Sequence, residues 1–180
     1  MARKFKFLRT GLKSNYDGFQ WEVGVWHKTN CTKLRYGFNC SEKIIDALRY
    51  VQGEILAEVE VRGKKFVGDD KSTHSEMRII KTWDWTREDS VALAIFAAEL
   101  VVEIFEAAYP NDPRPRNAIG AAKEWLENPS KAASEAAWAA ASEAASAASE
   151  AASAAASEAA SEAVLNKIEE WIIKYIERKG

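Results

Sequence analysis

The sequence predicts an α+β fold: a small mixed or antiparallel sheet with one helix, followed by an all-helical C-terminal part with a long Ala-rich helix. Before Trp85, apolar and polar residues alternate in several segments, as in half-buried strands. After Thr86, apolar residues recur at helical spacing, and from Lys131 alanine dominates. We therefore expect an α+β domain at residues 1–85 and a helical region at 86–180.

Composition narrows the classes of function. The chain has 25 Lys and Arg against 27 Asp and Glu, so it offers no basic field for nucleic acid or an anionic membrane. No apolar run is long enough to cross a bilayer, and the N-terminus lacks the apolar stretch of a signal peptide. We expect a cytoplasmic protein that binds neither nucleic acid nor membrane, with both cysteines as thiols.

The first elements are short. A strand is predicted at 4–8, and a half-buried strand at 21–26, where Trp21 and two valines alternate with other residues. Residues 33–38 are expected to pair with the second strand. A one-sided helix is predicted at 41–52, with the serine at its start as the N-cap.

An antiparallel pair forms the centre of the predicted sheet. Residues 54–62 give the clearest strand, because four apolar side chains alternate there with charged ones. A charged loop is predicted at 63–72, and the partner strand at 76–85. The apolar face of this partner strand consists of Met77, Ile79, Trp83 and Trp85.

The helical region begins with the most apolar segment of the chain. A helix is predicted at 86–109, because Thr86 and Asp89 form a capping box and a proline follows its end. Its apolar residues cover more than one face, so we expect it to be buried, with Phe96 and Phe105 in the core.

Two further helices are predicted at 113–127 and 131–178. At about 1.5 Å per residue, the last helix would be about 70 Å long, more than the others can cover. Part of it therefore has no partner within the chain. A bend near Asn166 that folds the end back on the body is the alternative.

The Ala-rich helix is the predicted interaction surface. Its Ser-Glu pairs recur at intervals that leave a strip of alanines, which allows close helix packing. We expect this strip to contact a second copy of the chain, forming a homodimer, or a helix of a foreign protein partner. The predicted interaction residues are Trp138, Ala144, Ala148, Ala151, Ala155, Ala159 and Trp171.

Two His and two Cys residues could together supply the ligands of a tetrahedral zinc ion. They are His27, Cys31, Cys40 and His74. However, the chain has no Cys-x2-Cys pair, and we expect His74 to lie apart from the other three. We therefore predict no metal and no cofactor, with both cysteines filling apolar space beside the sheet.

A second set of residues raises an enzymatic alternative. It is similar to the Glu-x-Glu and Ser-Thr elements of ADP-ribosyltransferases, although the order of the elements is reversed. The set consists of Glu58, Glu60, Ser72, Thr73 and Glu76. The alternative is an enzyme or binder of a nucleotide-like ligand at the sheet edge near Tyr36, Asn39 and His74. No catalytic residue is assigned, and a non-enzymatic protein is favoured.

Two stretches resemble known families. The N-terminal half, with WEVGVW, YGFNCSEKIIDALRYV, EILAEVEVRG and DDKSTHSEMRIIKTW, resembles a small uncharacterised domain of phage and prophage proteins. In that domain a strand ending in a Gly-Phe-His-Cys-like turn precedes a helix. Asn39 stands where many relatives have histidine, which argues against a metal or catalytic role for the turn.

The stretch YPNDPRPRNAIGAAKEW, followed by Ala-rich sequence, is similar to immunity proteins of bacterial polymorphic toxin systems. Gly120 stands where these relatives have a larger polar residue. The resemblance implies a helical array that binds and blocks a toxin. We therefore expect a non-enzymatic protein-binding protein that acts through its helical part, in the cytoplasm of a bacterial or phage-infected cell.

Overall fold

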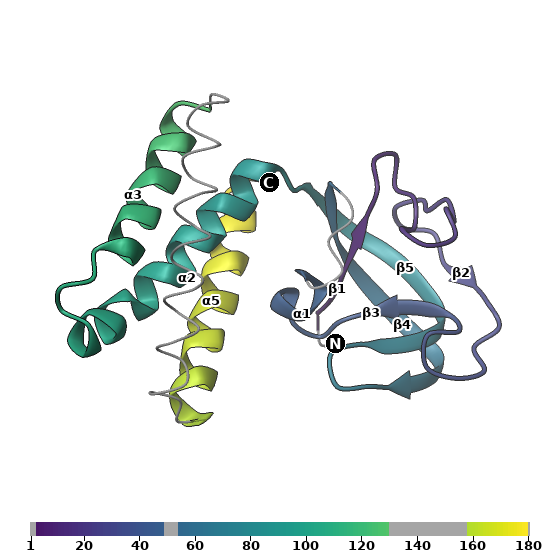
Figure 1. The fold of residues 1–180 in the computed structure, drawn as a ribbon. Coiled ribbons are helices and arrows are strands. Elements are labelled where there is room, and N and C mark those ends of the chain that lie inside the picture. Colours follow the sequence, from purple (N-terminus) through teal and green to yellow (C-terminus); the bar gives the residue numbers. More distant parts are fainter. Residues whose placement is uncertain (1–2, 49–53, 130–157, 180) are drawn as a thin grey trace. The chain divides into compact units, whose positions relative to one another are not determined.

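The computed structural model describes residues 3–48, 54–129 and 158–179 (Figure 1). It confirms the α+β class, because an antiparallel sheet precedes a region in which all described elements are helices. Contacts divide the chain into two units. The sheet unit comprises the residues up to Thr86 together with those from Trp171 onwards, and the helical unit is Arg87–Glu170.

The sheet unit is built on a long hairpin of β4 (Ile55–Val67) and β5 (Ser72–Asp84), which confirms the predicted antiparallel pair. Both strands are longer than predicted, because residues 65–67 pair with residues 72–74. The missed part of β4 is largely exposed. Its pairing rests on backbone hydrogen bonds rather than on burial, so it left no alternating pattern.

The other strands attach to this hairpin. β1 (Lys4–Leu8) pairs antiparallel with β4, whereas β2 (His27–Lys28) and β3 (Phe38–Cys40) pair with β5. β1 and β3 are then joined to each other by one backbone pair, in which Phe5 and Ser41 exchange two N–H···O bonds of 2.8 Å. The sheet therefore curls until its β1 and β3 sides meet.

The predicted strand at 21–26 is wrong. Trp21 is buried, but Val23 and Val25 are 50% and 42% exposed, so the three do not share a buried face. Gly24 has a φ of +83°, which interrupts an extended chain, and its N–H donates to Ile79 O at 2.8 Å. The alternating sequence belongs to a loop that inserts one tryptophan into the core.

The next two predictions also need correction. The predicted strand at 33–38 is mostly a tight turn, and β3 starts only at Phe38. The helix α1 (Ile44–Leu48) begins after the predicted N-cap, because Ser41 is paired with Phe5. Residues 49–53 lie outside the described residues.

Trp21 occupies the centre of the core on one face of the sheet. Its ring lies 4.7 Å from that of Phe38 and 5.0 Å from that of Phe19, and its Nε1 donates to Ser14 Oγ at 2.8 Å. The buried residues of this core are Leu8, Trp21, Phe38, Cys40, Ala57, Val59, Met77 and Ile79.

The helical unit contains α2 (Arg87–Ala108) and α3 (Arg114–Glu127). Their shared core has Ile95, Val102 and Ile119 at its centre, and Arg116–Glu106 and Lys123–Glu99 ion pairs link the two helices. None of the described helices has the length and apolar character needed to cross a membrane.

The prediction that α2 is buried on more than one face is confirmed only in part of the described helix. Phe105 is buried and Phe96 is half-buried, but Val101 and Ile104 are 41% and 54% exposed. α3 packs against one face of α2, on which Ile95 and Val102 lie. The α2–α3 core therefore does not account for the apolar residues Val101 and Ile104 on the opposite face.

The helix α5 (Glu158–Lys179) runs without interruption through Asn166, the predicted site of the alternative bend. Its last part belongs to the sheet unit, and Ile172 and Ile176 in this part are buried. Residues 130–157 lie outside the described residues, so the predicted single helix over 131–178 stays a prediction.

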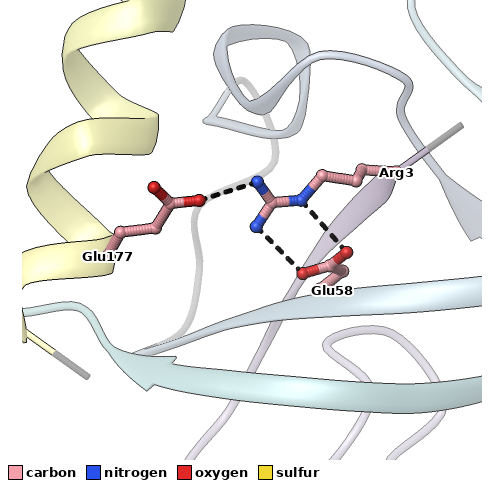
Figure 2. Close-up of polar contacts among 3 residues, drawn as sticks. All are labelled: Arg3, Glu58 and Glu177. Carbon is pink, nitrogen blue, oxygen red and sulfur yellow. Dashed lines mark hydrogen bonds and ion pairs between the residues drawn. The ribbon is translucent and has the colours of Figure 1, made fainter.

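An arginine joins the end of α5 to the sheet (Figure 2). The Nε and Nη2 atoms of Arg3 each donate to one carboxylate oxygen of Glu58 at 3.1 Å, and Nη1 donates to Glu177 Oε1 at 3.0 Å. These contacts raise the pKa of Arg3, the bond to Glu58 most. Close by in sequence, Lys179 Nζ donates to Asp84 O at 3.1 Å. The C-terminal helix is thus fixed by both polar contacts and buried isoleucines.

The burial of Ile172 gives a direct test of this anchoring. Ile172→Ala should lower the free energy of unfolding by about 2–5 kcal/mol, because it leaves a cavity in a fully buried position. Leu165→Ala is the matched control, since Leu165 lies in the same helix but is 42% exposed. Urea unfolding measures both. Equal, small losses for the two variants would show that α5 is not anchored through Ile172.

Candidate functional site

A cavity of about 600 Å³ lies between β1 and β3 in the sheet unit. Beyond the Phe5–Ser41 pair, the described residues of the two strands form no further backbone pairing, so the strands diverge. Residues of both strands line the cavity, together with the loop at 14–17 and the turn at 35–37. Its polar and charged lining residues are Lys6, Ser14, Asn15, Tyr16, Asp17, Arg35, Tyr36, Asn39, Ser41 and Lys71.

Lys6 is the basic residue on the β1 side of the cavity. Its Nζ lies 4.8 Å from the centroid of the Trp21 ring, so the ammonium group rests on the aromatic core. Among the described residues Lys6 forms no ion pair with a carboxylate. Burial lowers the pKa of Lys6 to about 8, and the nearby Cys40 and Asp17 partly oppose that shift. Lys6 is therefore mostly charged at neutral pH, without an acidic partner.

Arg35 and Tyr36 line the cavity from the turn before β3. Arg35 has a φ of 76°, which is unusual for a residue with a side chain. Thr73, fully buried on β5, holds this conformation: its Oγ1 accepts from Arg35 N at 2.9 Å and donates to Asn39 Oδ1 at 2.7 Å. Strained backbone of this kind concentrates at ligand sites.

Gly37 lets this turn approach β5. Its φ is +146°, and a Cβ added there would lie 2.8 Å from Thr73 Cγ2 and 3.0 Å from His74 O. A larger residue would displace the turn from β5. The position of Arg35 at the cavity thus depends on glycine two residues later.

The predicted metal candidates are only partly brought together. Cys40 Sγ and His74 Nε2 lie 3.7 and 2.9 Å from Ser72 Oγ, so the expectation that His74 lies apart from the others is wrong. Cys31 Sγ donates to Thr73 O at 3.8 Å, and His27 packs against the Phe19 and Trp21 rings. Within residues 3–48, 54–129 and 158–179, no group of three or more His, Cys, Asp or Glu could hold a metal ion.

Burial shifts the pKa values of Cys40 and His74. It raises the pKa of the Cys40 thiol, although the bond to Ser72 partly opposes the shift. It lowers the pKa of His74 to about 4, assisted by Lys4 and Lys65. Both side chains are therefore uncharged near neutral pH.

The structure does not assemble the transferase-like set. Glu58, Glu60 and Glu76 pair with Arg3, Arg78 and Arg62. Glu58 lies opposite Lys81, far along the hairpin from Ser72, which lies opposite Val67. Tyr36 and Asn39, named for the sheet-edge pocket, do line the cavity, whereas His74 does not.

The predicted interaction residues fall mainly outside the described chain. Trp138, Ala144, Ala148, Ala151 and Ala155 lie in residues 130–157. Ala159 and Trp171 are in α5, where the Trp171 ring stacks on that of Tyr175 at 4.7 Å. The association strip stays a prediction.

Sequence reasoning missed Lys6 and Arg35. Lys6 alternates with buried Phe5 and Phe7, a pattern that indicates an exposed strand face. Arg35 carries no motif. The one available signal is the glycine after Arg35-Tyr36, which indicates a turn but not what the turn faces.

Comparison with known families divides the chain near the first boundary between its two units. Residues 2–88 match the family described as "Domain of unknown function (DUF7666)". Residues 83–165 match the family described as "Imm-5 like putative immunity protein". Neither the curated proteins nor the solved structures gave a match. The helical part is thus similar to immunity proteins, which confirms that resemblance, while the phage or prophage setting stays a prediction.

Gly37 and Gly120 form a pair of contrasting variants. Gly37→Ala should destabilise the fold by about 2–4 kcal/mol, through its positive φ and the close Thr73 and His74 contacts. Gly120→Ala should stabilise it by about 0.5–1 kcal/mol, because Gly120 is in α3 and a Cβ there meets nothing within 4 Å. Chemical denaturation measures both. A neutral Gly37→Ala would refute the close approach.

His74 should make stability depend on pH. Its pKa is about 4 in the fold and about 6.5 when unfolded, so the unfolded chain binds more protons between these values. Its contribution is complete above pH 6.5 and is lost as the pH falls towards 4. His74→Gln should flatten this part of the stability profile. An NMR titration of the imidazole near pH 6.5 would contradict the prediction.

Proposed function

We propose that this protein is a non-enzymatic binding protein of the immunity type, whose helical unit binds and blocks a toxin protein. The match of residues 83–165 to the immunity family carries this proposal. The sheet unit, divided from the helical unit near Thr86, carries the match to a domain of unknown function. We infer that it is a separate module of the phage or prophage type. The protein acts in the cytoplasm of a bacterial or phage-infected cell.

The exposed face of α2 is the proposed contact surface. Val101 and Ile104 are spaced three apart and are well exposed. Ala94, Ala97 and Ala108 continue the same side of the helix at intervals of three and four residues. We call these five residues the α2 strip. Apolar side chains at this spacing are typical anchors of helix-mediated protein interfaces.

The other face of α2 supports this assignment. Two acidic residues lie beside the α3 contact and form ion pairs with α3, Glu99 with Lys123 and Glu106 with Arg116. Their ion pairs fix α3 on the face opposite the strip. The α2 strip is therefore held on a helix pair whose orientation does not depend on the partner.

The test uses two matched isoleucine variants of the tagged full-length protein, produced in its native cells. Ile104→Glu should reduce capture of the partner at least tenfold, because it places a charge in an apolar interface. Ile80→Glu is the control, since Ile80 on β5 is 43% exposed but belongs to the sheet unit. Mass spectrometry of the captured protein measures the change.

Co-expression then distinguishes an immunity protein from another binder. The captured partner should arrest growth when produced alone, and the wild-type protein, but not Ile104→Glu, should relieve the arrest. Capture that is lost with Ile80→Glu and kept with Ile104→Glu would refute the helical assignment. If the only captured protein is a second copy of this chain, the proposed toxin partner is wrong and the protein forms a homodimer instead.

A further inference from the structure

We propose that the cavity between β1 and β3 binds a small phosphate-bearing molecule with a planar ring, of the mononucleotide class. This site belongs to the sheet unit and is independent of the partner proposed for the helical unit.

The charges of the cavity favour an anion. Lys6, Arg35 and Lys71 line it, against Asp17 as the acidic residue of the described lining. In the described residues, neither Lys6 nor Arg35 forms an ion pair. Lys4, which precedes the cavity on β1, is by contrast paired with Glu42 at 2.7 Å. Two unpaired cations from different segments at one cavity are suited to the oxygens of a phosphate.

The surroundings of Lys6 should strengthen its interaction with an anionic ligand. Trp21 supports the ammonium group from the core side and Phe7 follows it on the strand, so contact with water is limited. A partly desolvated cation interacts more strongly with an incoming anion than an exposed one does. Its pKa, lowered to about 8 by burial, fits a charge that lacks its counter-ion.

Two tyrosines suit the planar ring. Tyr36 is 58% exposed, and Lys33 Nζ lies 4.4 Å from the centroid of its ring. Tyr16 is fully exposed and comes from the loop on the other side of the lining. Exposed aromatic rings beside cations are the usual platform for nucleic-acid bases. The Asn15 and Asn39 amides, also in the lining, bond within the protein, to Phe7 O and Gly37 O, so the tyrosines are the groups that would recognise the ring.

Pre-organisation and size agree with this ligand. Thr73 holds the strained backbone of Arg35 in place without a ligand, so little ordering remains for binding. The volume of about 600 Å³ lies in the range of sites for small organic molecules. A phosphate ion alone would leave most of this space unfilled.

The experiment titrates the full-length protein with adenosine 5′-monophosphate, adenosine and inorganic phosphate by isothermal calorimetry. The monophosphate should bind at least tenfold more tightly than either of the others. Lys6→Gln and Arg35→Asn should each weaken it at least tenfold, and asparagine at position 35 tolerates the positive φ. Lys64→Gln, an exposed lysine on β4 outside the lining, should leave binding unchanged.

Three results would overturn the proposal. They are no binding of the monophosphate at about 1 mM, equal affinity for adenosine and its monophosphate, and binding that Lys6→Gln and Arg35→Asn leave intact. Urea unfolding of each variant verifies that it is folded. The Ile104→Glu variant should bind the monophosphate normally, so failure here leaves the helical proposal standing.

Discussion

The antiparallel pairing of β4 and β5 is the constraint on which the sheet unit depends. Every other strand attaches to this hairpin, β1 through β4 and the two short strands through β5. Two register shifts, at Glu58/Val59 and Arg62/Lys65, interrupt the ladder. Such irregularities increase the twist and bend of a strand pair. Phe5 and Ser41 pair in the same curved sheet, and both residues line the cavity.

Burial explains which parts of the fold could be predicted. The apolar faces of β4 and β5 contact the core, so their alternation was informative, whereas the exposed end of β4 pairs with β5 without such a pattern. Around Val23 apolar and other residues alternate in the sequence, but their side chains do not alternate between a buried and an exposed face, because Gly24 turns the chain. The apolar content of α2 suggested burial, yet a surface for a second protein has the same composition.

The cavity could not have been predicted for a different reason. Its lining comes from β1, the loop at Ser14–Asp17, the turn at Arg35 and the strand β3. No spacing links these segments, and only the three-dimensional pairing brings them together. Polar residues of a strand face, such as Lys6, carry the same sequence signal whether they meet solvent or a site. Conversely, two of the residues considered as zinc ligands, Cys40 and His74, do lie close together. Both of them bond to the hydroxyl group of Ser72.

The sheet unit is discontinuous in the chain, and this affects its synthesis. Domains fold during translation as their residues leave the ribosome. The hairpin and all of Arg87–Glu170 are synthesised before Ile172 and Ile176, although both isoleucines are buried and belong to the sheet unit. The sheet unit is thus complete only after the whole helical unit has been made, although its strands are synthesised first. A ribosome that stalls late therefore leaves the N-terminal module, not the C-terminal one, incomplete.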